Sequence, residues 1–158
     1  MKPIFTRPAT PDDILTVAER MRQEDRDEVV AASGIDPLSA LLAQYAAGMD
    51  VQAAGLAEND RVEVLYGCDP VAGFPHVGVI WLLSTDVIYD HPVEFTIHSR
   101  ELFFQFHEHF PVLTNFVDTR NTRHIRWLRW LGCHMVRKVN KFGPFSLPFI
   151  EFASVRCA

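Results

Sequence analysis

Residues 115–133 read NFVDTRNTRHIRWLRWLGC and set the pattern of the fold. The apolar run before them predicts a buried strand over 111–118, because strands inside a sheet carry few polar side chains. Asn121 is a typical helix cap, and apolar residues at helical spacing predict a helix over 122–131. Gly132 ends this helix in the manner of a left-handed cap, and a further strand follows.

On either side of this run, helix and strand patterns alternate along the chain. Thr10 before Pro11 and Asp36 before Pro37 are helix starts, because each pairs a side-chain cap with a proline at the first helical position. The expected helices run from Pro11, over 25–32, from Pro37 to about Gly48, over 92–109 and over 122–131. The expected strands are 4–7, 51–57, 61–67, 77–83, 111–118, 133–139 and 147–153, with 77–83 in the middle of the sheet and covered on both faces. This order predicts one α/β domain over residues 1–158, a mixed β-sheet flanked by helices.

Length and composition fit a globular domain with a core of its own. Of the 158 residues, 48% are hydrophobic and 22% are charged. Cys68, Cys133 and Cys157 leave an odd thiol and lack metal-type spacing, which disfavours a disulfide framework or a zinc ribbon. No stretch approaches the roughly 18 apolar residues of a membrane span, so we expect no membrane association.

Charge is distributed unevenly along the chain. Residues 1–60 carry 11 acidic and 5 basic side chains, whereas residues 118–141 carry seven basic side chains and one acidic one. Two explanations stay open: acidic surfaces meet basic ones inside the fold, or copies of the chain make head-to-tail contacts.

The expected helix over 92–109 is apolar on two sides. One side is predicted to bury against the sheet and carries Phe95, Leu102, Phe103, Phe106 and Phe110. The other side carries Val93, Ile97 and Phe104 among charged residues. A helix with two apolar sides needs two partners, so either another element of the chain or a second protein covers the outer stripe.

The helix over 122–131 carries a second candidate docking surface. Arg123, Arg126, Trp127 and Trp130 gather away from its inward apolar side. Tryptophan and arginine are enriched in protein interfaces, although the two tryptophans could instead pack under Phe142, Phe145 and Phe149. Arginines at every third position spiral around a helix, so nucleic acid is only a minor alternative partner.

The strand, asparagine, short helix and glycine of residues 115–133 resemble the GNAT superfamily of N-acetyltransferases. More narrowly, the chain resembles the GNAT-like internal virion protein A family of short-tailed bacteriophages, with its pattern Asn-Thr-x-His-Ile-Arg-x-Leu-x-x-x-Gly. The matching positions are Asn121, Thr122, His124, Ile125, Arg126, Leu128 and Gly132. The segments 78–86 and 25–29 also resemble the sequences of this family. The resemblance implies a GNAT-like fold and a role in phage particles.

The resemblance also implies where a coenzyme would lie. GNAT enzymes hold the pyrophosphate of acetyl-CoA on backbone amides of a glycine-rich loop between the fourth strand and the next helix. The corresponding residues 84–92, STDVIYDHP, contain no glycine and two carboxylates, and like charges disfavour an anion. We therefore expect no cofactor. The alternative is acetyl-CoA, with Asn121 as a cofactor-binding residue.

The proton donor of many GNAT enzymes is a tyrosine on the helix after this asparagine, and Leu128 stands in its place. His124, Glu63, Asp118 and Tyr89 are conceivable substitutes, but no spacing singles one out. We predict no catalytic residue.

Other chemistries find no pattern in the sequence. The histidines of His107-Glu108-His109 diverge on a helix and do not face one ion, so no metal site is predicted. Motifs of hydrolases and nucleotide-binding loops do not appear.

The resemblance implies a bacteriophage virion-associated structural or assembly protein with a GNAT-like fold, and the departures at residues 84–92 and at Leu128 predict that it has no transferase activity. It would form a homo-oligomer or bind phage head or tail proteins, in the virion or in the host cytoplasm during assembly. The alternative is an active acetyl-CoA-dependent N-acetyltransferase that modifies a protein or a small amine.

Overall fold

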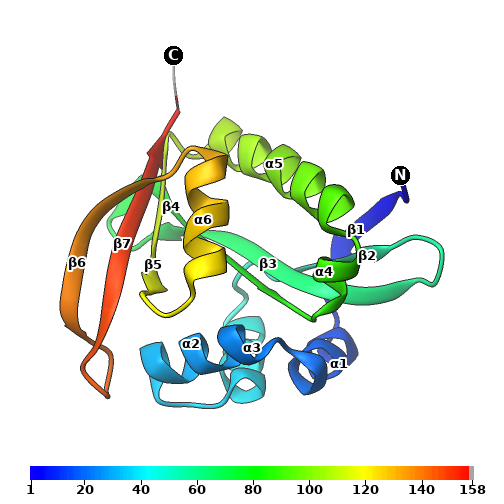
Figure 1. The fold of residues 1–158 in the computed structure, drawn as a ribbon, viewed down its shortest axis with the longest axis horizontal. Helices are drawn as coiled ribbons and strands as arrows, with labels where there is room; N and C mark the ends of the chain where they lie inside the picture. The colour runs from blue at the N-terminus through cyan, green and yellow to red at the C-terminus, as the bar shows by residue number, and fades with distance from the viewer. Residues whose placement is uncertain (157–158) are drawn as a thin grey trace.

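The first element is a strand, three helices and three strands follow it, and the remaining helices lie before and after the fifth strand (Figure 1). The computed structural model describes residues 1–156. The helices are α1 (Pro11–Arg20), α2 (Gln23–Ser33), α3 (Pro37–Ala46), α4 (Val87–Asp90), α5 (Pro92–His109) and α6 (Thr122–Leu131). The strands are β1 (Ile4–Pro8), β2 (Gln52–Leu56), β3 (Arg61–Val71), β4 (Phe74–Ser84), β5 (Val112–Asp118), β6 (His134–Phe142) and β7 (Leu147–Val155). The predicted α/β fold with a mixed sheet and flanking helices is confirmed.

The strands form one sheet in the order β1-β2-β3-β4-β5-β7-β6. Only β4 and β5 run parallel among its pairs, and every other neighbouring pair is antiparallel. A parallel pair needs a crossover rather than a hairpin, and α5 provides it. As predicted, the strand that contains residues 77–83 lies in the middle of the sheet.

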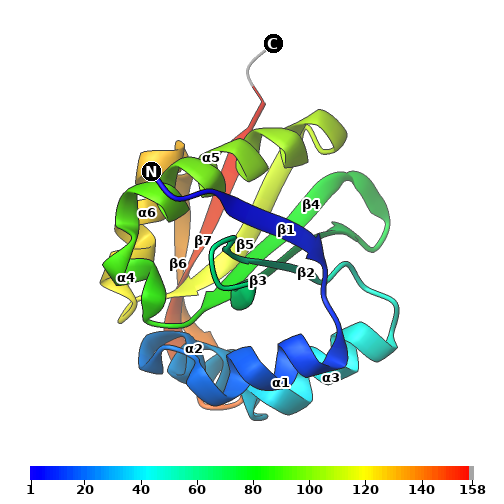
Figure 2. The ribbon, with the colours of Figure 1, turned by 90° about the vertical axis from the view of Figure 1, so that its right-hand side faces the viewer.

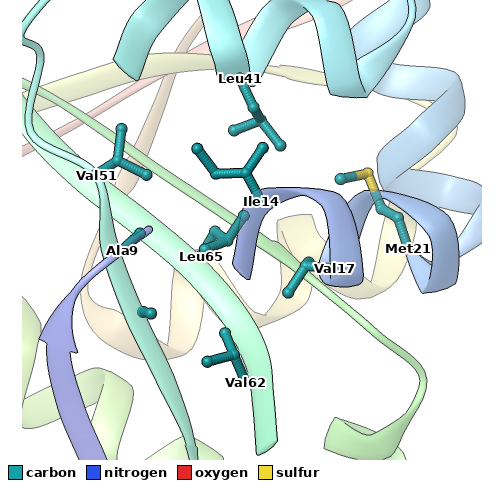
Figure 3. Packing of buried hydrophobic residues seen from close by; sticks show 9 residues of the cluster. Ala9, Ile14, Val17, Met21, Leu41, Val51, Val62 and Leu65 are labelled. Atoms are coloured by element: carbon teal, nitrogen blue, oxygen red, sulfur yellow. The ribbon is translucent and has the colours of Figure 1, made fainter. Parts of the chain in front are cut away.

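Helices cover both faces of the sheet. Figures 1 and 2 show α1, α2 and α3 on one side and α5 on the other, with α6 beside β5 and β7. Under α1 and α3, a core cluster joins Ile14, Val17 and Leu41 to strand residues such as Val62 and Leu65 (Figure 3). On the α5 side, a second cluster holds Cys68, Ile80, Phe103, Leu113, Val117, Ile125, Leu128, Cys133 and Phe152.

The helices begin and end where local chemistry predicts. The Thr10 hydroxyl accepts a hydrogen bond from the Asp13 amide, and the Asp13 carboxylate accepts one from the Thr10 amide, which completes a capping box. The side chain of Asp36 accepts from the Ser39 amide at the start of α3. Gly132 takes the left-handed conformation, with φ 99°, at the end of α6.

Three expectations about the elements are corrected. First, β3 and β4 extend beyond 61–67 and 77–83 and meet in a hairpin turn at Gly73. The strands can continue past Pro70 because a register shift at Pro70/Val71 accommodates this proline near the end of the hairpin. Second, the short helix α4 lies in the segment expected to be a loop. Third, Trp81, Leu82 and Leu83 of the middle strand are only half-buried, because they line a cavity described below.

The two described cysteines, Cys68 and Cys133, are buried free thiols, and burial raises the pKa of each to about 12. Cys157 lies outside the described residues. No helix within residues 1–156 has the length and apolar character needed to cross a lipid bilayer.

Candidate functional site

The parallel strands β4 and β5 pair over a short distance and then part. Their register joins Val77 to Val112, Gly78 to Leu113 and Val79 to Thr114. At the next position a side-chain hydrogen bond replaces the backbone pairing: Nδ2 of Asn115 donates to the Ile80 carbonyl at 2.8 Å. The ladder therefore ends at a side-chain hydrogen bond, and a gap opens between the two strands.

A cavity of about 250 Å³ occupies this gap, and its walls come from both sides of the sheet. Residues of α2 and α3 line it on one side, and residues of α5 and α6 line it on the other. A second cavity of about 190 Å³ adjoins it under α4 and α5. The two share the wall residues Tyr66, Leu82, Ser99, Leu102, His124 and Trp127.

Glu28 of α2 is the polar centre of the larger cavity. Its Oε2 accepts from the Asn121 side-chain amide at 3.0 Å and from the backbone amide of Asp118 at 3.3 Å. Its Oε1 lies 3.9 Å from Nδ1 of His124. These contacts join α2 to the end of β5 and the start of α6, which lie within residues 115–133.

Burial sets the charges of Glu28 and His124. It raises the pKa of Glu28 to about 8, because loss of water disfavours the carboxylate more than the two amide donors favour it. Burial also lowers the pKa of His124 to about 4, because the imidazolium is disfavoured in the same way. Near neutral pH, Glu28 and His124 are therefore an uncharged acid and an uncharged imidazole rather than an ion pair.

A second polar group lies beside the smaller cavity. Buried Arg22 pairs with Asp25, and its Nη1 donates to the Tyr89 hydroxyl at 2.7 Å. Asp25 in turn accepts from the Ser84 amide at 2.9 Å. The Arg123 guanidinium lies over the Tyr89 ring, 4.5 Å from its centroid. This network ties the end of β4 and the helix α4 to α2 and α6.

The connection from β4 to α5 does not fit a pyrophosphate cradle. Four backbone amides of this segment donate within the chain. The amide of Thr85 donates to the Glu63 carbonyl and that of Val87 to the Thr85 hydroxyl. The amides of Tyr89 and Phe95 donate to the carbonyls of Asp86 and His91. Amides that bond inside the protein cannot also bind phosphate oxygens. The carboxylates of Asp86, Asp90 and Glu94 lie along the same segment. The side chains and amides here therefore disfavour a diphosphate.

Asn121, the conditional cofactor residue, is 3% exposed and has two structural bonds. Its Oδ1 accepts from the His124 amide at 3.4 Å, which caps α6, and its Nδ2 donates to Glu28. Leu128, at the position of the expected tyrosine, is fully packed in the core. Of the four conceivable proton donors, His124 and Asp118 adjoin Glu28, Tyr89 binds Arg22, and Glu63 pairs with Arg20.

The outer stripe of α5 is exposed, so no described element of the chain covers it. The alternative in which another element of the chain covers this stripe is therefore wrong. Val93 is 60% exposed, Ile97 41% and Phe104 56%. Trp130 of α6 is 50% exposed, and the Arg100 guanidinium lies 5.6 Å from the ring centroids of both Phe104 and Trp130. Arg100 thus links the stripe to α6 and makes one continuous surface, which we call the α5–α6 outer face.

Trp127 departs from the expected docking surface. It is half-buried, and its Nε1 donates to the Ser99 hydroxyl at 3.1 Å. Because it lies between α6 and α5, it forms part of the cavity wall. Arg123 and Arg126 remain exposed. Phe142 and Phe149 do not cover the tryptophans; they stack on each other, and Phe142 also stacks on Phe116.

Sequence reasoning missed the central role of Glu28 and the linking role of Arg100. Glu28 was visible only as part of a familial segment, and no spacing connects it to His124. Within residues 1–156, no group of three or more metal-ligating side chains is placed to hold an ion. His107 instead bonds the Ser154 hydroxyl and the Phe110 carbonyl.

Comparisons with known proteins bear on the fold. No protein-family model matches the chain, and no curated protein sequence matches it. Among solved structures, a ribosomal-protein-alanine N-acetyltransferase from Brucella melitensis has a TM-score of 0.66 at 17% identity, covering 96% of this chain and 99% of its own. A GNAT-family acetyltransferase from Bacillus anthracis has a TM-score of 0.71 at 14% identity, covering 98% and 96%. The protein yncA from Salmonella typhimurium, solved with its cofactor acetyl-CoA, has a TM-score of 0.63 at 14% identity, covering 96% and 93%. With these neighbours, the strand order and the parting of β4 from β5 identify the fold of this chain as that of the GNAT acetyltransferases.

Proposed function

We propose that this chain is a virion-associated structural or assembly protein of a short-tailed bacteriophage that uses a GNAT fold to bind other proteins and transfers no acetyl group. Its partners are phage head or tail proteins or further copies of itself, in the virion or in the host cytoplasm during assembly. The phage assignment rests on the pattern of residues 121–132.

The observation that carries the binding role is the α5–α6 outer face. Val93, Ile97, Phe104 and Trp130 are large apolar side chains exposed on neighbouring helices. Exposed apolar surface next to arginine is typical of protein interfaces, since it releases water on binding and keeps polar handles at its rim. The β4–α5 connection is acidic and four of its amides bond within the chain, which supports the absence of acyl transfer.

The first test is the substitution Phe104→Asp. A charge in the centre of a desolvated contact is costly, so we expect the variant to lose its oligomer or its binding to virion proteins while its melting temperature stays unchanged. Leu15→Asp is the matched control, because Leu15 is also exposed, at 43%, but lies on α1 away from this face.

Light scattering and mass spectrometry of purified particles give the readout. If Phe104→Asp keeps the oligomer, the contact between copies lies on another surface. A monomer at all concentrations that is also missing from particles would overturn the proposal.

The second candidate function is acetyl-CoA-dependent N-acetyl transfer to a protein or a small amine. The gap between β4 and β5 and its cavity favour it, and a structural neighbour was solved with acetyl-CoA. Calorimetry separates the two functions: heat of binding with acetyl-CoA at micromolar concentration would favour the transferase, and none up to millimolar cofactor would exclude it.

A further inference from the structure

The larger cavity has no part in the proposed protein-binding role, and its walls are mainly apolar. Nine of its 24 lining residues are aromatic, among them Trp81, Phe106 and Trp127. Lysine and arginine are not among the residues that line it. An engineered apolar cavity of about 150 Å³ is known to bind benzene, so about 250 Å³ has room for a substituted six-membered ring.

Buried polar atoms on this wall lack partners. Nδ1 of His124 and Oε1 of Gln44 are buried without a hydrogen bond to any described residue. Each such atom has lost its hydrogen bond to water, which is unfavourable unless something else satisfies it. By contrast, Asn115 on the same wall is satisfied at both ends of its amide, by the Ile80 carbonyl and the Phe116 amide. Nε1 of Trp81, which also lines the cavity, likewise lacks a partner. Of these unpartnered atoms, Nδ1 of His124 is the one that lies beside Glu28.

The distance between Glu28 and His124 explains what is missing. Their nearest atoms, Oε1 and Nδ1, are 3.9 Å apart, too far for a direct hydrogen bond. One hydroxyl or amide group between them can donate to one atom and accept from the other. Such a group suits either tautomer of the imidazole, because it has both a donor and an acceptor.

Charge narrows the class of ligand. Near neutral pH the raised pKa of Glu28 and the lowered pKa of His124 leave both groups uncharged. No lysine or arginine lines the larger cavity, and Arg22, which lines the adjoining smaller cavity and acts on His124, is already paired with Asp25. An anion therefore meets no unpaired cation on this wall, and its transfer from water is unfavourable. A cation would have to ionise Glu28 in a place where burial disfavours the carboxylate.

We propose that the larger cavity binds a small uncharged molecule with a flat apolar body and one hydroxyl or amide group that bridges Glu28 and His124. The rings supply dispersion and area, and the bridge supplies orientation. This role is separate from docking through the α5–α6 outer face, so either proposal can fail without the other.

The test uses three matched probes on the full chain at pH 6.5: benzyl alcohol, toluene and benzoate. They share one ring and differ in the group attached to it. We expect benzyl alcohol to bind about fivefold more tightly than toluene, the gain of one net hydrogen bond, and benzoate not to bind. Titration followed by NMR chemical shifts gives the three affinities.

Two variants place the effect. His124→Phe keeps an aromatic ring and removes both nitrogens, so benzyl alcohol is expected to bind no better than toluene. His109→Phe, at an exposed position on α5, is the matched control and is expected to keep the fivefold preference. A thermal melt of each variant shows that it is folded, and if His124→Phe is not, Glu28→Leu provides the same comparison.

Three outcomes would overturn the proposal. The first is equal binding of toluene and benzyl alcohol to the natural chain. The second is no binding of benzyl alcohol at about 10 mM, ten times a weak Kd of about 1 mM. The third is displacement of benzyl alcohol by acetyl-CoA at micromolar concentration. The last would show that the cavity receives an acyl group instead.

Discussion

The half of the sheet under α1 and α3 is packed far more completely than the junction of β4 and β5. In the first region Ile14, Val17 and Leu41 are no more than 1% exposed, and a tight apolar cluster surrounds them (Figure 3). In the second region the strands part and leave a cavity of about 250 Å³, and several aromatic residues on its walls, such as Trp81 and Trp127, are only half-buried.

The difference shows where the fold has its stability and where it has room for a ligand. Close packing gains dispersion from every neighbouring atom, so the α1–α3 side is expected to dominate the free energy of unfolding. The β4–β5 junction gives up part of that gain. It holds instead a buried acid, an imidazole and unpartnered polar atoms, which a simple core would not contain.

The largest expected effect comes from truncating one side chain in each region. Ile14→Ala leaves a void in a closed core and is expected to lower the free energy of unfolding by about 2–5 kcal/mol. Leu102→Ala enlarges a cavity that already exists, since Leu102 is half-buried and lines it, and is expected to cost about 1–2 kcal/mol. Urea unfolding measures both, and equal losses would remove the distinction between the regions.

The next effect is on the pH dependence of stability. Folding raises the pKa of Glu28 from 4.5 to about 8 and lowers that of His124 from 6.5 to about 4. Between pH 4.5 and 6.5 the native state keeps the Glu28 proton and the unfolded state keeps the His124 proton, so the two contributions nearly cancel. From pH 6.5 to 8 only the native state holds an extra proton, and stability should fall by about 1.4 kcal/mol per pH unit.

Glu28→Gln should abolish that fall, because the amide stays uncharged and can still accept from Asn121. Glu24→Gln is the control, an exposed carboxylate on the same helix. Unfolding free energies at pH 6.5, 7.25 and 8 for the three proteins decide the matter. An unchanged slope in Glu28→Gln would mean that another group titrates.

The smallest expected effect compares two helix caps. Thr10→Ala removes the cap of α1 and is expected to cost about 1 kcal/mol. Asn121→Ala removes the cap of α6 and also the donor to Glu28, so its loss should exceed that of Thr10→Ala. Thermal unfolding compares the two, and equal losses would show that the bond to Glu28 adds nothing to stability.

Much of the fold follows from local patterns. The helix over 92–109 and the helix over 122–131 have the predicted bounds, because Pro92, Asn121 and Gly132 act on their own neighbours. The exposed stripe of Val93 and Phe104 was also visible, since helical spacing alone sets which side chains share a side. The hairpin at Gly73 was missed because Pro70 reads as a strand end when its bulge is unknown.

The candidate site was less accessible to sequence reasoning. Trp127 looked like a surface residue because its helix side carries arginines, yet α5 lies close enough for Ser99 to accept from its indole. Arg100 was one charge among several until the structure placed it between Phe104 and Trp130. Both errors concern contacts between different helices.

Caps, turns and periodicity act over a few residues, and for this reason the amino-acid sequence alone predicts most of the helices and strands and their order. The meeting of Glu28 with His124 has another origin. It depends on α2 and α6 converging where β4 and β5 part, and on the loss of water that keeps both groups uncharged. Desolvation and long-range packing are properties of the assembled molecule, so no local pattern could have revealed them.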